Sequence, residues 1–311
     1  MIVFWLVMMG VFSIWASPTF GTFNNLMLIL GAASITGIFA AGAAFGIMTG
    51  LLDLSLPGTA ALAGVVVGKI LLAGTPVWLA LLAGVAVGVA VGLVNGFLTL
   101  RGLNSLVVTI GTFSVLTGLA SVVSGGVPIG GYARLDFIGA QTYARIPGPA
   151  FVMIGVFVIG TLFMTQTRAG VRMVAVGGNK EAVRRAGVSV DRYIVLGFIL
   201  VSVCAAIGGI VIAAFTSSAA PVPDPTILFS ALTAVALSGM PLSGGRGSLA
   251  RVVIGALIIA TVASALTIKN IQPYWVPVAT GVLLIAALVL ERVLSTAVSA
   301  RLVSLHESKA N

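Results

Sequence analysis

The sequence predicts an all-α, polytopic integral membrane protein that forms a single domain over residues 1–311, and three observations support this. Hydrophobic residues make up 59% of the chain and charged residues only 7%, whereas soluble domains carry about a quarter charged residues. Apolar stretches of roughly 20 residues, the length that crosses the hydrocarbon of a bilayer, recur along the chain. Basic residues gather in the polar stretches between them, as they do in cytoplasmic loops.

These stretches predict about ten transmembrane helices. The first begins at once, because the opening residues 1–16 are apolar and lack a preceding basic region, which favours a membrane helix over a cleaved signal peptide. Later stretches are bounded by polar residues, glycine and proline, which set the limits of each expected helix. In chain order the helices are expected near residues 2–16, 26–48, 56–73, 77–100, 104–124, 149–165, 193–215, 227–242, 249–268 and 274–290.

An even number of crossings places both termini on the same side of the membrane. We expect the protein in the inner membrane of a bacterial cell, with both termini in the cytoplasm. The inner segments would then hold Arg101, residues 166–192, Arg246, Arg251, Arg292, Arg301 and Lys309. The outer segments would hold Lys69, Arg134, Arg145 and Lys269. This asymmetry follows the positive-inside rule. The net charge of +9 is therefore explained by topology and contact with anionic membrane lipid, and it does not indicate nucleic-acid binding.

Three segments interrupt the apolar pattern. Residues 50–58 contain Asp53 and Pro57, which predicts a broken helix buried in protein or lining a wet cavity. Residues 125–148 are rich in glycine and aromatic residues and are compatible with an outward-facing docking surface or with a plain surface loop. Residues 237–248 predict a glycine turn at the cytoplasmic end of a helix.

One helix carries a spacing that predicts close packing. Gly84, Gly88, Gly92 and Gly96 recur every four residues and therefore lie on one helix face. Small residues at this spacing allow two membrane helices to approach closely. We expect this face to pack against another helix and to carry no ligand.

The sequence holds no catalytic set. The single cysteine, Cys204, and the single histidine, His306, exclude a disulfide framework and a Cys/His metal cluster. The chain also lacks a G-x-x-x-x-G-K-[ST] phosphate loop, paired carboxylates in one span and a Ser/His/Asp arrangement. We therefore expect a protein that is not an enzyme and binds no cofactor. If ATP drives it, another chain must bind the nucleotide.

The longest polar segment, residues 166–192, predicts a short capped helix on the cytoplasmic side. Asn179 is a plausible N-cap, and Gly187 stands where the helix would end. Glu181 and Arg185 have the i,i+4 spacing of an ion pair. The apolar stripe consists of Ala182, Val183 and Ala186 and would suit the groove of another protein. From these residues alone, a solvated loop that only fixes topology is equally compatible.

A second group of polar residues lies within the apolar helices. Asp53 is the one acid in a hydrophobic region, which marks it as a candidate functional residue, although a structural cap at a helix break is equally compatible. One acid is a poor proton relay, which argues against a secondary transporter. Uncharged polar side chains could line a route for a hydroxyl-rich solute or join helices to one another. With Asp53 the group comprises Ser55, Asn95, Thr109, Thr112 and Ser114.

Four motifs in sequence order resemble those of the permease subunits of sugar-type ABC importers, such as the ribose, xylose and galactose permeases, and more distantly those of branched-chain amino acid permeases. They are LLDLS at 51–55, NG at 95–96 with SLVVTIGTFSVLTG at 105–118, TRAGVRMVAVGGNKEAVRRAGV at 167–188, and SGGRGS at 243–248. The similarity runs from about Phe20 to the last helix. Departures from the family pattern fall at Leu51, Leu56, Pro57, Gly58, Asn104, Ser105, Ser238, Met240, Pro241 and Arg251.

The resemblance implies a permease that couples to a separate ABC ATPase subunit through Gly177, Gly178, Asn179, Glu181, Ala182, Arg185 and Gly187. It also implies a second permease subunit, which completes the translocation path, and an extracytoplasmic binding protein that delivers a solute. A monosaccharide is the expected solute. Branched-chain amino acids, nucleosides or a furanose-like signal molecule remain alternatives, as does an autonomous proton-coupled carrier.

Overall fold

The computed structural model describes the backbone of residues 1–310 and the side chains of residues 1–293. Arg301, His306 and Lys309, which the sequence places in the tail, lie outside the described side chains. The described chain is predominantly helical, as predicted. Its apolar helices are α1 (Ile2–Trp15), α2 (Phe23–Met48), α3 (Leu56–Leu72), α4 (Val77–Leu100), α5 (Ser105–Ser124), α7 (Gly148–Gln166), α10 (Val190–Phe215), α11 (Thr226–Leu237), α12 (Leu249–Ile268) and α13 (Trp275–Ala310).

The predicted count of ten membrane crossings is not confirmed. Within the described residues, seven helices are long and apolar enough to cross a bilayer: α2, α4, α5, α7, α10, α12 and the Trp275–Val293 part of α13. The apolar helices α1, α3 and α11 are shorter than 18 residues. A helix rises 1.5 Å per residue, so 12 residues, the length of α11, cover only about 18 Å. The predicted helix at 227–242 stops at Leu237 because Gly239, at φ +74°, and Pro241 follow it.

The predicted broken helix near residues 50–58 is not confirmed either. Residues 49–55 form a non-helical segment that joins two separate helices, α2 and α3. Alternate residues of this segment, Thr49, Leu51, Asp53 and Ser55, are buried. The polar break was therefore correctly located, but it is a buried connection and interrupts neither helix.

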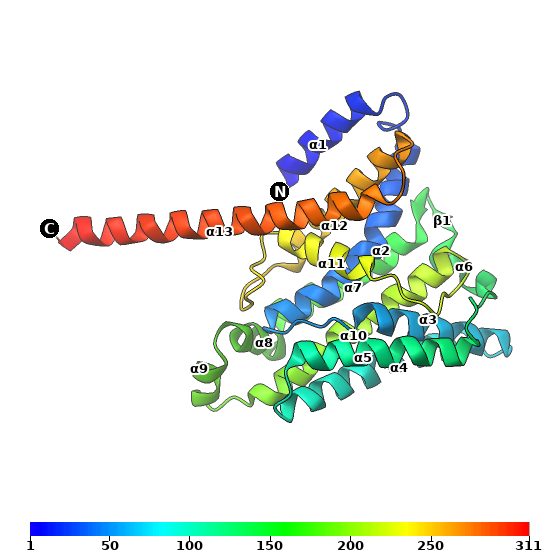
Figure 1. Ribbon diagram of the computed structural model, residues 1–311, viewed down its shortest axis with the longest axis horizontal. Helices are drawn as coiled ribbons and strands as arrows, with labels where there is room; N and C mark the ends of the chain where they lie inside the picture. Colours follow the sequence, from blue (N-terminus) through cyan, green and yellow to red (C-terminus); the bar gives the residue numbers. More distant parts are fainter. Residues whose placement is uncertain (311) are drawn as a thin grey trace.

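Polar elements lie at the two ends of the molecule (Figure 1). At one end, α8 (Arg168–Gly178) and α9 (Lys180–Arg185) lie past the end of α2. The opposite end carries η1 (Tyr132–Leu135), α6 (Asp136–Gly139) and a hairpin of β1 (Thr142–Tyr143) and β2 (Ile146–Pro147). The hairpin is antiparallel and pairs Thr142 with Pro147 and Tyr143 with Ile146. Helix α1 begins toward the α8–α9 end, and α13 runs back toward it.

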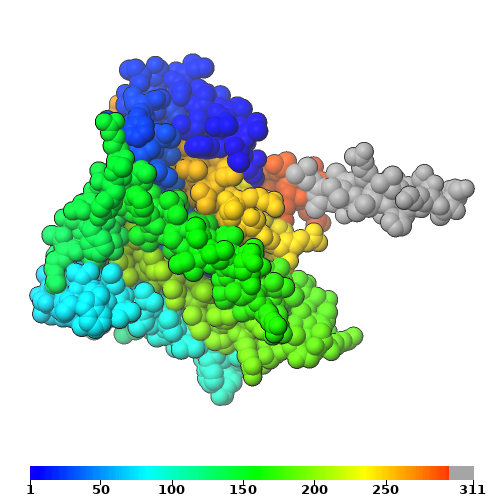
Figure 2. Space-filling model, turned by 180° about the vertical axis from the view of Figure 1, so that it is seen from behind, coloured from blue at the N-terminus to red at the C-terminus, as the bar shows by residue number. Residues whose placement is uncertain are grey.

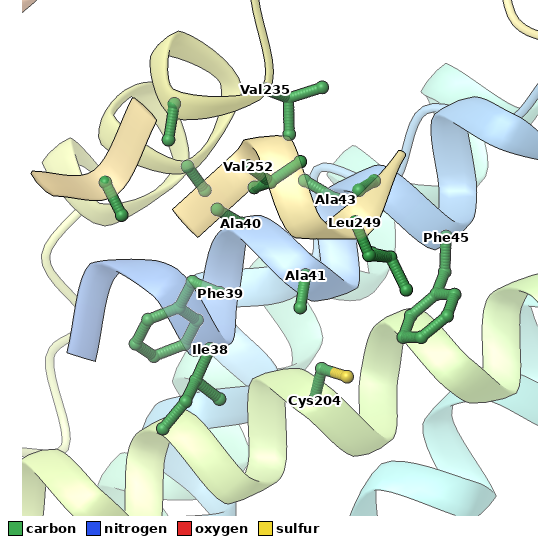
Figure 3. Close-up of a cluster of buried hydrophobic side chains, with 14 of the residues drawn as sticks. Ile38, Phe39, Ala40, Ala41, Ala43, Phe45, Cys204, Val235, Leu249 and Val252 are labelled. Carbon is green, nitrogen blue, oxygen red and sulfur yellow. The ribbon is translucent and has the colours of Figure 1, made fainter. Parts of the chain in front are cut away.

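The core is centred on α2 and α10, the most buried of the long helices. Figure 3 shows Ile38, Phe39 and Phe45 of α2 among side chains of α10, α11 and α12. The side chain of Phe39 is fully buried, and Cys204 of α10 belongs to the same cluster. The 49–55 segment, which follows α2, and the α8–α9 segment, which precedes α10, are therefore attached to the most buried helices of the molecule.

The glycine face of α4 packs against α10, which confirms the predicted close packing. A Cβ atom added to Gly88 would lie 2.7 Å from the Ser202 carbonyl oxygen, and one added to Gly92 would overlap Ile199. At Gly96 the nearest atom would be Cα of Val195 at 3.0 Å. Any side chain on this face would therefore push the two helices apart.

Candidate functional site

Helix α9 is the short capped helix that the sequence predicts. The Asn179 side chain accepts a hydrogen bond from the Ala182 backbone N–H at 2.9 Å, as an N-cap does. At the other end Gly187 has φ +77°, and its N–H donates to the Arg184 carbonyl oxygen at 3.0 Å. The left-handed conformation is available to glycine at low cost and ends the helix. Asn179 and Gly187 thus hold a six-residue helix that would be too short to persist alone.

Glu181 holds two arginines of the same helix. Its carboxylate lies 3.1 Å from Nε of Arg185 and 3.8 Å from a guanidinium nitrogen of Arg184. All three side chains are largely exposed, so each pair contributes only a few tenths of a kcal/mol to stability. The pairs therefore orient the charged groups of α9 more than they stabilise the fold.

The three residues of the predicted apolar stripe of α9 do not share one environment. Ala182 and Ala186 are exposed. Val183, predicted to face a partner with them, instead packs onto an apolar cluster of this chain. We name it the Leu51 cluster; its buried members are Leu51, Val176, Val190, Ile194 and Phe198. This corrects the prediction for Val183, because its side chain anchors α9 to the membrane helices. Of the three stripe residues, only Ala182 and Ala186 are exposed.

The α8–α9 turn borders a hollow at this end of the molecule. Gly178 and Asn179 are exposed, whereas Gly177 is half-buried. The hollow has a volume of about 620 Å³ and is lined by Gly177, Gly178, Pro241, Leu242, Ser243, Gly244, Gly245, Arg246, Leu288, Glu291 and Arg292. Figure 2 shows α8 and α9 in green and yellow-green at the lower right edge of the molecule. This surface is accessible in the isolated chain.

Four of the six polar residues singled out from the sequence form one hydrogen-bonded chain. Oγ1 of Thr112 donates to Oδ1 of Asn95 at 2.7 Å, and Nδ2 of Asn95 donates to Oγ of Ser55 at 2.9 Å. The Ser55 hydroxyl then donates to Oδ1 of Asp53 at 2.6 Å. We call this the Asp53 network. It joins α5 and α4 to the 49–55 segment, and every donor in it points toward the carboxylate.

Asp53 also closes a local side-chain turn just before α3. Its Oδ1 accepts a second hydrogen bond, from the Ser55 backbone N–H at 2.8 Å, at the start of α3. Both this carboxylate and the hydroxyl of Ser55 are buried. Among the described residues, Oδ2 of Asp53 has no hydrogen-bond partner. The structure therefore gives Oδ1 a local structural role, in a turn just before α3, and leaves the second oxygen unassigned.

Thr109 and Ser114 do not join the network. Thr109 is buried and donates to the Leu106 carbonyl oxygen of its own helix at 3.2 Å. Ser114 is exposed and donates to the Ile110 carbonyl oxygen of its own helix at 3.4 Å. Thr112 alone of the four network residues borders a groove, an apolar hollow of about 700 Å³ between α4 and α5. Asp53, Ser55 and Asn95 lie behind it.

Comparison with known proteins identifies the family. Residues 25–288 match the model of the "Branched-chain amino acid transport system / permease component" family. The chain belongs to this permease family. It is 33% identical to the D-allose transport system permease protein AlsC of Escherichia coli K12, over 93% of this chain and 90% of AlsC.

Other relatives are similar over nearly as much of the permease. The L-arabinose permease AraH of Escherichia coli K12 is 33% identical over 88% of this chain and 84% of AraH. The ribose import permease RbsC of Bacillus subtilis is 31% identical over 89% of this chain and 87% of RbsC. The resemblance to sugar-type ABC importer permeases drawn from the four motifs is thereby confirmed.

The opposite end of the permease is only partly an exposed loop. Tyr132, one of the three aromatic residues of residues 125–148, is buried, and its hydroxyl donates to the Gly64 carbonyl oxygen. Ile129 pairs with Ala219 through two backbone hydrogen bonds of 2.9 and 2.8 Å. Phe137 and Tyr143 remain exposed. The segment is thus tied to α3 and to the loop after α10, and it presents two aromatic side chains outward.

Three segments that are far apart in the sequence meet in the permease, which was not predicted. Backbone contacts join Gly50, which precedes LLDLS, to Gly177 and to Gly244 of SGGRGS, and they join Gly177 to Gly245. The Leu51 cluster was not predicted either, because its members carry no polar signal. The glycines near the ends of the helices could have indicated such a contact, but their spacing in the sequence does not show which of them meet. No group of three His, Cys, Asp or Glu residues in the described part could hold a metal ion.

Proposed function

We propose that this chain is the transmembrane permease subunit of an ATP-driven ABC importer for a monosaccharide. The observation that carries the proposal is the similarity to AlsC, which spans 93% of this chain and whose name describes D-allose transport. AraH and RbsC are named for two further monosaccharides, L-arabinose and ribose. All three are sugars with several hydroxyl groups and no charge.

The ATPase would be a separate subunit that docks on α9. The sequence contains no phosphate loop of its own. Helix α9 is exposed, capped at both ends and rich in oriented charges, and the small side chains of Ala182 and Ala186 leave room for a close approach. We assign Gly177, Gly178, Asn179, Glu181, Ala182, Arg185 and Gly187 to this contact. ATP binding would close two ATPase subunits, and α9 would move with them.

We place the α8–α9 end in the cytoplasm of a bacterial cell and the protein in its inner membrane. Arg101, Arg246 and Arg251 lie in or next to the connections at this end, together with the basic residues of α8 and α9. The positive-inside rule favours the cytoplasm for such an end. In this arrangement α1, α3 and α11 complete ten crossings together with the seven longer helices, and both termini are cytoplasmic.

The solute would pass beside α5. Ser114 is exposed on this helix and Thr112 borders the groove next to it, so a closed route past them requires a second permease subunit. Uncharged hydroxyls suit a sugar, because they exchange hydrogen bonds with it without a fixed charge. Asp53, Ser55 and Asn95 would hold Thr112 in position, and Thr109 would contribute from the neighbouring turn. A binding protein would deliver the solute at the hairpin end.

Transport in proteoliposomes tests the proposal. The permease is reconstituted with its ATPase subunit and binding protein, and uptake of labelled D-allose, L-arabinose, D-ribose and leucine is measured with and without ATP. We expect ATP-dependent uptake of one of the sugars. Uptake of leucine alone would assign the chain to amino acid import. Uptake that continues without the ATPase and collapses with the proton gradient would show an autonomous carrier and overturn the proposal.

A further inference from the structure

Three segments that are far apart in the sequence meet backbone to backbone at the α8–α9 end. A Cβ atom added to Gly177 would overlap the Met48 carbonyl oxygen and lie 2.9 Å from the backbone nitrogens of both Gly50 and Gly245. One added to Gly244 would lie 2.8 Å from the Ile47 carbonyl oxygen and 3.0 Å from Cα of Gly50. Gly50, Gly177, Gly244 and Gly245 therefore form a compact contact, which we call the glycine joint.

The glycine joint requires glycine for its conformation as well as for its space. Gly50, Gly244 and Gly245 have φ of +75°, +91° and +73°. Residues with a side chain rarely adopt these angles. The SGGRGS motif, to which Gly244 and Gly245 belong, thus has a role that does not involve a ligand. It supplies a turn whose glycines have no side chains, so that its backbone can contact the end of α8.

The glycine joint lies between the proposed ATPase contact and the Asp53 network. On one side, Gly177 is two residues from Asn179, which caps α9. On the other, Gly50 is three residues from Asp53. The Leu51 cluster connects the two sides. It contains Leu51 of the 49–55 segment and Val176 of α8, and Val183 of α9 packs against it. Close-packed contacts of this kind transmit a displacement, since they leave no empty space to absorb it.

We propose that the glycine joint is the element through which a movement of α8 and α9 reaches the Asp53 network, so that Gly50, Gly244 and Gly245 act as positioning residues for transport. This inference rests on the proposed docking of an ATPase on α9. It assigns the LLDLS and SGGRGS motifs to the transmission of movement. Neither Gly50 nor Gly244 needs to touch ATPase or solute for this role.

The test compares glycines that share a left-handed backbone but differ in contact. Gly50→Ala and Gly244→Ala disturb the glycine joint. Gly74→Ala and Gly239→Ala are the matched controls, because these residues have φ of +79° and +74° and no described atom lies within 4 Å of an added Cβ. Each variant is reconstituted with its partners, and solute uptake and ATP hydrolysis are both measured. A cysteine at position 180, introduced as Lys180→Cys, reports docking by cross-linking to the ATPase.

We expect Gly50→Ala and Gly244→Ala to keep the cross-link and ATP hydrolysis, while uptake per ATP falls about tenfold, within the range typical of coupling between sites. The controls should keep the wild-type ratio. An unchanged ratio in both joint variants would overturn the inference. If Lys180→Cys in an otherwise unchanged permease forms no cross-link, the proposed docking of α9 fails, which is a separate result.

A second measurement leaves the glycine joint intact and covers the case in which its variants do not fold. Leu54 is half-buried beside Asp53, and Leu54→Cys in a Cys204→Ala background gives a single reporter thiol. We expect its labelling rate in the assembled complex to change several-fold between the nucleotide-free state and the state trapped with ATP and vanadate. Equal rates in the two states would show that the movement does not reach the 49–55 segment and would overturn the inference.

Discussion

The α8–α9 segment and the Asp53 network differ in how their polar groups are satisfied. In α9, Glu181 pairs with Arg184 and with Arg185 on an exposed surface. In the network, Asp53, Ser55 and Asn95 are buried, and its hydrogen bonds link α5 to α4 and α4 to the 49–55 segment. Exposed pairs can be exchanged for a partner at little cost, whereas buried bonds cannot be broken without leaving orphaned groups. The comparison suggests a surface that engages a partner and an interior that keeps helices in register.

The largest expected effect comes from reversing the charge of the exposed region. Glu181→Arg removes the anion that orients Arg184 and Arg185 and adds a fourth cation to α9, beside Lys180, Arg184 and Arg185. Gly178→Arg puts a long side chain on the open turn. Repulsion or obstruction of this kind costs several kcal/mol at an interface. We expect both variants to reach the membrane while ATP-dependent uptake falls on the order of a hundredfold.

Uptake by proteoliposomes and ATP hydrolysis by the same samples check this expectation. Glu181→Gln is the matched control, because it removes the charge without reversing it and should retain most of the uptake. Normal uptake by Glu181→Arg and Gly178→Arg would show that the α9 surface is only a solvated loop.

In the buried region, Asn95→Leu should have the next largest effect. The substitution keeps the number and branching of the side-chain heavy atoms but removes the acceptor of Thr112 and the donor to Ser55. Unsatisfied buried groups cost about 1–3 kcal/mol each, so we expect a loss of roughly 2–4 kcal/mol in the free energy of unfolding and a strong loss of uptake. Thermal unfolding in detergent measures the first quantity.

Asn25→Leu separates stability from transport. Asn25 is also buried and bonded, since its Nδ2 donates to the Phe20 carbonyl oxygen at 2.9 Å and its Oδ1 accepts from Ser264 at 2.7 Å. It lies near the start of α2, away from the Asp53 network. We expect a comparable loss of stability with near-normal uptake by the folded protein. Equal losses of uptake in Asn95→Leu and Asn25→Leu would show that the Asp53 network contributes to stability only and has no specific role in transport.

Thr112→Val and Thr109→Val sharpen the comparison within one helix. Thr112 bonds to another helix, and Thr109 bonds only to its own. Removing the Thr112 hydroxyl leaves Oδ1 of Asn95 without a donor and should cost about 1–2 kcal/mol in the free energy of unfolding. Thr109→Val should cost less than about 1 kcal/mol, since its acceptor keeps other backbone contacts. Thermal unfolding of both variants checks the difference, and a larger cost for Thr109→Val would contradict it.

How much of this was predictable depends on the range of the interactions involved. Asn179 and Gly187 bound α9 through bonds to residues three positions away, so the local sequence sufficed for the helix. The packing face of α4 was equally predictable, because glycines spaced four residues apart lie on one face of a helix. In the Asp53 network, by contrast, the bond between Ser55 and Asn95 joins residues 40 positions apart. The sequence supplied its members, but only the packing of α3, α4 and α5 shows that Thr112 joins it and Ser114 does not.

The errors have the same origin. Val183 was assigned to an outer stripe because helical periodicity places it near Ala182 and Ala186, but the Leu51 cluster lies on the inner side. The helix predicted at 227–242 was too long because an apolar stretch continues past Leu237, while Gly239 and Pro241 end the helix. The glycines of the glycine joint were visible in the sequence, but their spacing does not show that Gly50, Gly177 and Gly244 meet.

The smallest expected effect concerns the cap of α9. Asn179→Ala removes the hydrogen bond to the Ala182 N–H and should weaken α9 by about 1 kcal/mol. That free energy corresponds to roughly a fivefold loss of apparent affinity for the ATPase subunit, which titration of the purified subunit onto the permease in nanodiscs would measure. Asn179→Asp keeps a capping oxygen and should bind nearly as well. Equal losses in both variants would argue against the capping role.

The most direct test of the central claim is a cross-link between α9 and the ATPase in the assembled importer. Lys180→Cys lies in the first turn of this exposed helix, and a short bifunctional reagent should join it to the ATPase subunit in a nucleotide-dependent yield. Tyr143→Cys, on the hairpin at the opposite end, is the control and should give no such product. Cross-linking of the ATPase from position 143 and not from position 180 would contradict the account.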